Sequence, residues 1–408
     1  MRLKECRACG SKDLGIFLDL GNSPISNDYQ GSLSEKNQIF PLEVLVCNNC
    51  EFLQLSEVHD PSTHFNASYP YFSGYSSTWA NHCSKSAKEF AQEFKLSEGK
   101  LVLEIASNDG TFIRNFVEYG ADILGIEPSQ NVAKHAIDSG IPTRVDFFSR
   151  KLALSLVNQG IQPDLIIGCN VLAHVPDVRD FLEGISILLN KDSVAILEFP
   201  HATKLIQDCQ FDTIYHEHYS YLNVTPLLPI LEKNGLRIFR ISTHELHGGS
   251  LRIFVCRIES DLVNSSSVKE IIDLESNWRP TSASIQKDLN SKVSSTLIAF
   301  KEKLEEYRNS GYKVVAFGAA AKGTTLLNIA QIDSRLIQFA VDSSAAKQGK
   351  FIPGTDILIR EPEALVDSGQ DRIVILAWNF AEEIMNQANY ICGSKQKYLI
   401  PIPIVKEL

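Results

Sequence analysis

The sequence lacks the features of several large classes of protein. Its longest apolar runs, such as residues 314–321, fall far short of the roughly 18 residues that a membrane-spanning helix needs. It has no basic block, and 39 basic against 49 acidic residues give a formal net charge of −10. We therefore expect neither a nucleic acid nor a membrane as a partner. The first residues contain no apolar stretch with a small-residue cleavage site, so we place the protein in the cytoplasm.

Two C-x-x-C pairs, Cys6–Cys9 and Cys47–Cys50, stand near the N-terminus. Each pair presents two thiolates on one turn, and the four together supply the closed tetrahedral shell of a structural zinc site. Such a shell stabilises the folded state, which matters because a segment of about 60 residues has a small core of its own. Two redox-active motifs, or four unrelated thiols, are the alternatives. The other five cysteines are scattered, and we expect each to be a small buried hydrophobic residue.

Residues 100–257 alternate short apolar runs with amphipathic segments, a rhythm typical of a parallel sheet with helices on both faces. The expected strands span residues 101–105, 123–126, 165–168, 194–198 and 251–256. A helix is expected to open within residues 109–114, where Asn108 or Asp109 can cap it and Gly110 lets a ligand approach the backbone.

Acidic and amide side chains follow the first two of these strands, at the edge where open α/β sheets bind ligands. Glu127 closes the second strand and is suited to accept both ribose hydroxyls of a nucleoside. The loop of residues 104–110 has one glycine preceded by acids, instead of the G-x-G-x-x-G that cradles a pyrophosphate. Its carboxylates suit the ammonium and sulfonium groups of S-adenosylmethionine. This pattern favours a class I methyltransferase; a nicotinamide-dependent enzyme and a relic of the fold without a cofactor are the alternatives.

The residues expected to bind this cofactor lie at the ends of successive strands. Asp146 would read the adenine amino group, and Asn170 follows the next strand. The full expected set is Glu104, Asn108, Asp109, Gly110, Glu127, Asp146 and Asn170.

The densest polar cluster spans residues 212–221 and contains Tyr-His-Glu-His at positions 215–218. Two histidines, a glutamate and three tyrosines in such a short stretch need hydrogen-bond partners or solvent. General acid–base chemistry fits, because a histidine with a near-neutral pKa beside a Glu and a Tyr is a common base assembly. A solvent-exposed surface segment is one alternative. A metal site is another, although the H-E-x-x-H spacing and a third ligand are lacking.

Three further segments hold residues suited to binding. Residues 69–77 are aromatic and either line a site or pack as a linker. Residues 247–252, His-Gly-Gly-Ser-Leu-Arg, form a turn whose glycines expose N–H groups and whose arginine suits a phosphate; a plain hairpin is the alternative. Residues 313–325 indicate a strand, a small-residue turn and a helix start carrying Lys322, which together predict an anion cradle or, alternatively, only tight helix–sheet packing. Asp342 ends the next strand, where an acid can bind a sugar or base hydroxyl.

Taken in order along the chain, five motifs resemble those of one family. They are the four-cysteine module, the E-I-x-S-N-D-G loop, Y-H-E-H, H-G-G-S-L-R and G-A-x-x-K-G. The combination resembles the sugar C-methyltransferases that methylate C3 of a nucleoside-diphosphate 4-keto-deoxysugar during deoxysugar biosynthesis. The resemblance covers nearly the whole chain.

The resemblance implies roles for individual residues. In that family the second histidine of Y-H-E-H removes the sugar proton, and this histidine is His218 here. Matching positions imply that it is supported by Tyr215, Glu217, His174 and Tyr69. The residues expected to bind the substrate are Tyr71, which is also an alternative to Tyr69, and His216, His247, Gly249, Arg252, Gly318, Lys322 and Asp342.

The chemistry agrees with these residue types independently. Carbon is a poor nucleophile, so C-methylation requires a carbanion, and a neighbouring ketone stabilises that carbanion as an enolate. One base and one oxyanion donor suffice: His218 would take the proton and Tyr215 would stabilise the oxygen, so that the carbon attacks the sulfonium methyl. A sugar O-methyltransferase and a non-enzymatic nucleotide-sugar-binding protein are the alternatives.

The sequence thus predicts an α/β protein in three parts. Residues 1–68 would form the four-cysteine zinc-binding module, and residues 69–260 a class I methyltransferase domain with a Rossmann-like fold. Residues 261–408 would form a helical bridge, broken at Pro280, and a second Rossmann-like domain that binds the nucleotide sugar. We expect S-adenosylmethionine and a structural Zn²⁺ as cofactors, a TDP-linked or alternatively GDP-linked keto-sugar as substrate, and a monomer.

Overall fold

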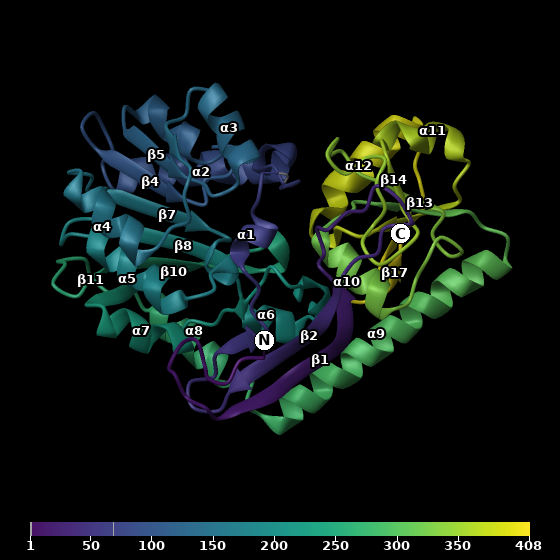
Figure 1. The fold of residues 1–408 in the computed structure, drawn as a ribbon, viewed down its shortest axis with the longest axis horizontal. Coiled ribbons are helices and arrows are strands. Elements are labelled where there is room, and N and C mark those ends of the chain that lie inside the picture. The colour runs from purple at the N-terminus through teal and green to yellow at the C-terminus, as the bar shows by residue number, and fades with distance from the viewer. Residues whose placement is uncertain (1, 68) are drawn as a thin grey trace.

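The computed structural model of the chain describes residues 2–67 and 69–408, apart from the side chains of His247 and Asp367. Within that part, the strands form three sheets, of four, seven and six strands. The seven-stranded sheet and its helices lie on the left in Figure 1, and the six-stranded sheet lies on the right. The long helix α9 (Ala283–Asn309) runs below the six-stranded sheet and beside the strands of the four-stranded sheet.

The seven-stranded sheet has the order β10-β11-β8-β7-β4-β5-β6. Its strands are β4 (Leu101–Ile105), β5 (Asp122–Ile126), β6 (Thr143–Arg144), β7 (Leu165–Cys169), β8 (Val194–Pro200), β10 (Leu236–His244) and β11 (Ser250–Arg257). Strands β4 to β8 are parallel to one another, whereas β11 runs antiparallel to both of its neighbours. This order, with one reversed strand near its end, is that of the class I methyltransferase fold. The predicted fold class is confirmed.

All five strands predicted for this region are confirmed, with small shifts at their ends. Apolar runs predict them because strands covered on both faces are almost continuously hydrophobic. The other two strands give no such signal. β6 consists of two half-buried polar residues, and β10 mixes buried with partly exposed residues at the sheet edge.

Helices cover both faces of this sheet (Figure 1). They are α2 (Ser77–Glu93), α3 (Gln130–Asp138), α4 (Arg150–Asn158), α5 (Val178–Leu188), α6 (Ala202–Gln207) and α7 (Leu228–Lys233). Short 3₁₀ helices are η2 (Ile113–Tyr119), η3 (Leu172–His174), η4 (Phe211–Thr213), η5 (Thr225–Leu227) and η6 (Leu246–Gly248). The prediction of a regular helix that opens within residues 109–114 is wrong, because a 3₁₀ helix, η2, begins there instead.

The four-stranded sheet joins two parts of the chain that are far apart in sequence. Three strands, β1 (Leu14–Pro24), β2 (Ile39–Cys47) and β3 (Leu53–Leu55), come from the N-terminal region. The fourth, β9 (Ser220–Tyr221), follows the Y-H-E-H motif and pairs with β3. Along the chain, the short helices α1 (Pro61–His64) and η1 (Ser73–Tyr75) connect β3 to α2. The four-cysteine segment and the Y-H-E-H motif are thereby tied to one sheet.

The predicted helical bridge consists of α8 (Ser267–Ser276) and α9, separated by a turn that contains Pro280. It leads to the six-stranded sheet, whose order is β14-β13-β12-β15-β16-β17, with only β17 antiparallel to its neighbour. The strands are β12 (Val314–Phe317), β13 (Phe339–Val341), β14 (Leu358–Arg360), β15 (Arg372–Ile375), β16 (Tyr398–Ile400) and β17 (Lys406–Glu407). The helices are α10 (Ala321–Ile329), η7 (Pro362–Ala364), α11 (Leu365–Ser368), η8 (Trp378–Phe380) and α12 (Ala381–Cys392). The expected second Rossmann-like unit is confirmed.

Two apolar cores hold the N-terminal module between the larger sheets. Phe17 of β1, Phe300 of α9 and Leu326 of α10 are buried together in one core. Cys6 and Phe52 are buried in another, which they share with the seven-stranded sheet. None of the helices in the described part of the chain is long and apolar enough to cross a membrane.

Candidate active site

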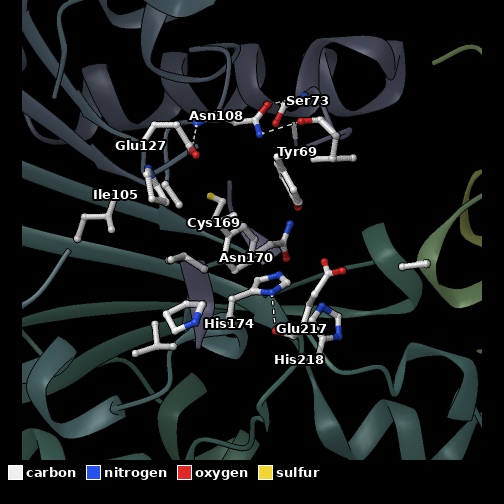
Figure 2. Close-up of a pocket in the computed structure, with 18 of the residues that line it drawn as sticks. Tyr69, Ser73, Ile105, Asn108, Glu127, Cys169, Asn170, His174, Glu217 and His218 are labelled. Carbon is white, nitrogen blue, oxygen red and sulfur yellow. Dashed lines mark hydrogen bonds between the residues drawn. The ribbon is translucent and has the colours of Figure 1, made fainter. Parts of the chain in front are cut away.

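A cavity of about 580 Å³ opens at the carboxyl edge of the seven-stranded sheet. Residues after β4, β5 and β7 line one end of the cavity. Residues from the start of α10 and from η8 line the cavity as well. Figure 2 shows Asn108 and Glu127 at one end, His174 and His218 at the other, and Tyr69 between them. The cavity thus brings the predicted cofactor loop and the Y-H-E-H motif together.

The loop after β4 has the backbone of a glycine-rich loop although it contains one glycine. Ala106, Asn108 and Gly110 have positive φ values of 56°, 50° and 75°. Glu127 holds the loop, because its carboxylate accepts the N–H groups of Asn108 (3.0 Å) and Ser129 (2.7 Å). This left-handed run also explains why no regular helix starts at residue 109.

Four of the seven residues predicted to bind the cofactor line the cavity, namely Asn108, Glu127, Asp146 and Asn170. The Oδ1 atom of Asn170 is buried and has no hydrogen-bond partner among the described residues. A buried acceptor without a partner is costly unless a ligand donates to it. The Asn170 oxygen and the Glu127 carboxylate both line this cavity, and as acceptors they fit the ammonium and hydroxyl donors of S-adenosylmethionine.

The other three predicted cofactor residues do not line the cavity but build its loop. The buried carboxylate of Glu104 accepts the N–H of Ile113 at 3.0 Å, and burial raises its pKa. Asp109 accepts the N–H groups of Gly74 (2.9 Å) and Thr111 (3.1 Å). A Cβ atom at Gly110 would lie 2.2 Å from the Ile141 Cδ1 atom, and the φ of 75° strains residues with a side chain, so the position favours glycine.

Residues 69–77 form a strap across the cavity, which carries Tyr69 and Tyr71 to its wall. Four side chains bond the backbone of the strap. Asn108 accepts the Ser73 N–H and Asn131 donates to the Tyr69 carbonyl. Ser344 donates to the Pro70 carbonyl and Glu383 accepts the Ser77 N–H. The first two belong to the seven-stranded unit and the last two to the six-stranded unit. The strap therefore links the cofactor loop to the C-terminal part of the molecule.

The hydrogen bonds of His218 define its protonation. Its Nδ1 lies 2.8 Å from the carbonyl oxygen of Thr213, which can only accept, so Nδ1 carries the proton. Its Nε2 lies 2.7 Å from the hydroxyl of Tyr215. Burial raises the pKa of Tyr215 above its ordinary value, so this hydroxyl is protonated and donates. In the neutral ring this leaves Nε2 as the basic nitrogen, 2.7 Å from the Tyr215 hydroxyl inside the cavity.

His174 and Glu217 stand beside this pair. The His174 ring centroid is 4.7 Å from that of His218, and its Nδ1 donates to the Glu217 carbonyl at 2.8 Å. Burial lowers the pKa of His174 to about 4, so the ring is neutral at pH 7. Burial raises the pKa of the Glu217 carboxyl to about 7, while two 2.8 Å contacts from the Asn27 amide nitrogen favour its charged form.

Two lysines reach the cavity from the C-terminal unit. Lys322, at the start of α10, donates to Asn379 at 2.9 Å and lies 4.5 Å above the Trp378 ring. Burial lowers its pKa. Lys347 also lines the cavity and pairs with Asp342 at 3.2 Å. Two cations beside a helix N-terminus suit an anionic group.

The predicted substrate-binding residues divide into two groups. Tyr71 and Lys322 line the cavity, whereas His216, Gly249, Arg252, Gly318 and Asp342 do not. The side chain of His247 lies outside the described residues.

The residues away from the cavity have structural partners that the sequence does not reveal. The Arg252 guanidinium is buried and pairs with Glu198 at 2.6 Å, so it is not available to a phosphate. Buried His216 contacts the carbonyl of Pro41 at 3.2 Å. Asp342 accepts the N–H of Ala319 at 2.8 Å and so fixes the turn that begins at Gly318. The residues that follow this turn, Ala320 to Lys322, line the cavity.

The cavity residues that are absent from the predicted set include Asn27, Lys347 and Asn379. Lys347 stands beside Lys350 in a cationic turn, which is a weak signal in the sequence. Asn27 and Asn379 give none, because neither belongs to any of the motifs in the sequence. Their contribution depends on how distant segments pack.

The four predicted zinc ligands are brought together. The Sγ atoms of Cys6, Cys9, Cys47 and Cys50 all lie within 4.8 Å of one another, and the closest pairs are 3.6 and 3.7 Å apart. Sulfur atoms about 3.8 Å apart are what a tetrahedral ion with metal–sulfur bonds of about 2.3 Å requires. The residues therefore fit a closed structural Zn²⁺ site.

The chain matches three family models in succession. Residues 6–65 match a zinc binding domain, residues 79–241 a methyltransferase domain, and residues 245–403 the C-methyltransferase C-terminal domain. C-methyltransferase NovU from Streptomyces niveus is 29% identical over 403 residues, which cover 98% of this chain and 96% of NovU.

Two other similarities are confined to part of the chain. Ubiquinone biosynthesis O-methyltransferase from Azorhizobium caulinodans is 26% identical over 111 residues, which cover 26% of this chain and 43% of that protein. The crystal structure of magnesium protoporphyrin IX methyltransferase from Synechocystis PCC 6803 with bound SAM is 16% identical. The superposed region covers 44% of this chain and 79% of the magnesium protoporphyrin IX methyltransferase chain, with a TM-score of 0.34.

Proposed function

We propose a substrate and a mechanism for this chain, which belongs to the S-adenosylmethionine-dependent C-methyltransferases with an N-terminal zinc-binding domain. It methylates C3 of a nucleoside-diphosphate 4-keto-deoxysugar. The observation that supports this most directly is the geometry of His218: its Nδ1 is bonded to the Thr213 carbonyl and its Nε2 lies next to the Tyr215 hydroxyl, in the cavity that also contains the cofactor loop.

Asn108, Glu127, Asp146 and Asn170 hold S-adenosylmethionine, which supplies the methyl group that takes the place of the sugar proton. The four cysteines would hold Zn²⁺ with thiolates alone, and such a shell would leave no position for substrate, so the metal would be structural.

His218 removes the proton from C3 at its Nε2 atom. The bond from Nδ1 to the Thr213 carbonyl fixes the ring orientation and keeps Nε2 unprotonated before the reaction. The Tyr215 hydroxyl turns from Nε2 to the ketone oxygen and stabilises the negative charge that develops there as the proton leaves. Glu217 and Tyr69 hydrogen-bond the sugar, and neutral His174 holds the loop that carries Glu217.

The diphosphate of the substrate lies beside Lys322 and Lys347, at the N-terminus of α10. TDP is the favoured nucleotide and GDP the alternative. We accordingly assign zinc binding to residues 1–68, methyl transfer to residues 69–260, and nucleotide-sugar binding to residues 261–408.

The test is incubation of the purified protein with S-adenosylmethionine and TDP- or GDP-linked 4-keto-deoxysugars, with mass detection of the products. The matched 4-hydroxy sugars are the control, because they have no ketone to acidify C3. A gain of one methylene unit with the keto-sugars alone, placed on carbon by NMR, is the expected result. Methylation of the 4-hydroxy sugars, or a methyl group on oxygen, would reject the proposal.

A further inference from the structure

We propose that the zinc-binding module positions the two active-site histidines through Arg7, the residue that follows the zinc ligand Cys6. This inference deepens the proposed function and rests on it. It assigns Arg7 a positioning role, because its side chain acts on the backbone beside the histidines and does not line the cavity.

The buried Arg7 guanidinium bonds two separate segments at once. Its Nη1 donates to the carbonyl oxygens of Val175 and Pro176, each at 3.0 Å. Its Nη2 donates to the carbonyl oxygen of Tyr219 and to Ser220 Oγ, the latter at 2.7 Å. One planar group therefore fixes the distance between the two segments.

These two segments are the ones that carry the active-site histidines. His174 directly precedes Val175, and His218 directly precedes Tyr219. The two imidazole rings are 4.7 Å apart and face the same cavity (Figure 2). Arg7 thus fastens both histidine segments at the residue next to each ring.

The module in turn fixes Arg7 itself. Its backbone N–H donates to Gln54 Oε1 at 3.0 Å, and its guanidinium lies 5.7 Å from the centre of the Phe52 ring. Cys6 and Cys9 hold the turn on either side through the zinc shell. The zinc-ligand turn is therefore connected to the two histidine segments through the backbone of Arg7 and its side chain.

The choice of a charged side chain here is informative. No carboxylate among the described residues lies within ion-pair distance of Arg7, and its acceptors are carbonyls and a hydroxyl. Burial penalises this cation, as its lowered pKa of about 10 shows, even though the charges of Cys6 and Asp177 favour it; an apolar side chain would avoid that penalty. What arginine adds is a rigid fork of donors that holds several acceptors in a fixed geometry.

The test compares Arg7→Met and Arg7→Lys with wild type and with Arg279→Met. Arg279 is a matched control, because it is an exposed arginine that bonds Glu51 at 2.6 Å, beside the second pair of zinc ligands. Zinc content, melting temperature, S-adenosylmethionine affinity, kcat and KM are measured. Imidazole NMR signals of His174 and His218 are recorded without substrate.

Arg7→Met should keep its zinc and its cofactor affinity, and KM should change little. Its kcat should fall about 10²-fold, as expected for a misplacement of about 1 Å, and both imidazole signals should shift. Arg7→Lys should recover part of kcat, and Arg279→Met should match wild type throughout. Wild-type kcat and unshifted signals in Arg7→Met would overturn the inference, as would a loss of kcat that only follows a loss of zinc.

Two provisions keep the test decisive. If Arg7→Met does not fold, Ser220→Ala removes one acceptor of the fork, and its imidazole signals should shift toward those of Arg7→Lys; unshifted signals in both variants would reject the inference. If wild type methylates no keto-sugar, the proposed function fails, whereas the substrate-free imidazole signals still judge the role of Arg7.

Discussion

Hydrogen-bond partners set the chemistry of individual side chains in this site. The Thr213 carbonyl decides which nitrogen of His218 is basic, and the Asn27 amide bears on the charge of Glu217. The motif Y-H-E-H predicts which residues react, but not their protonation. Protonation depends on partners such as Asn27 that come from elsewhere in the chain.

Asn27→Leu should raise the pKa of Glu217 above about 7, because it removes N–H contacts that favour the charged carboxylate. Any limb of the pH profile of kcat/KM that requires ionised Glu217 should then move to higher pH. Asn37→Leu, in the same loop but bonded to Asp28 and to the Gly354 N–H instead of Glu217, should leave the profile unchanged. A limb that stays in place or moves to lower pH in Asn27→Leu would contradict this account.

At the scale of secondary structure, buried strands are readable from the sequence and loops are not. β4, β7 and β8 are buried on both faces and mostly apolar, so their hydrophobic runs predict them. The loop of residues 106–110 has the left-handed geometry of a glycine-rich loop, but alanine and asparagine occupy two of its three left-handed positions. Composition alone therefore conceals it.

Ala106→Gly should raise the free energy of unfolding by up to about 1 kcal/mol, because glycine adopts positive φ without strain. Ala106→Val should lower it, since a β-branched residue is strained further at such a position. Thermal and urea unfolding of both variants measure the effect, and calorimetry checks that Ala106→Gly still binds S-adenosylmethionine. A less stable Ala106→Gly protein would show that the loop is not strained at this position.

At the scale of the whole molecule, the zinc-binding module is part of the active-site architecture. It supplies Asn27 to the cavity and Arg7 to the histidine segments, and β3 pairs with β9. The sequence predicts the zinc ligands and the Y-H-E-H motif separately, because each is local. Their proximity in the fold depends on the pairing of β3 with β9, two strands that are distant in sequence, and such pairing leaves no local sequence pattern.

Cys47→Ser should abolish stoichiometric zinc binding, because it removes one of four ligands from a closed shell. We expect a lower melting temperature as a result, whereas wild type carries one zinc per chain. Cys392→Ser, far from the cluster, should keep both its zinc and its stability. Fully folded wild-type protein without zinc in elemental analysis would reject the site.

The central claim is that His218 generates a carbanion at the sugar C3, and hydrogen exchange tests it most directly. The 4-keto nucleotide sugar is incubated in deuterated water with the protein and S-adenosylhomocysteine, which has no methyl group to transfer. NMR then follows the loss of the C3 proton. Wild type should exchange it rapidly. His218→Ala should bind both ligands but exchange about 10²- to 10⁴-fold more slowly, the usual loss for a general base, and Tyr215→Phe should be slowed less. Exchange at the wild-type rate in His218→Ala would contradict the account.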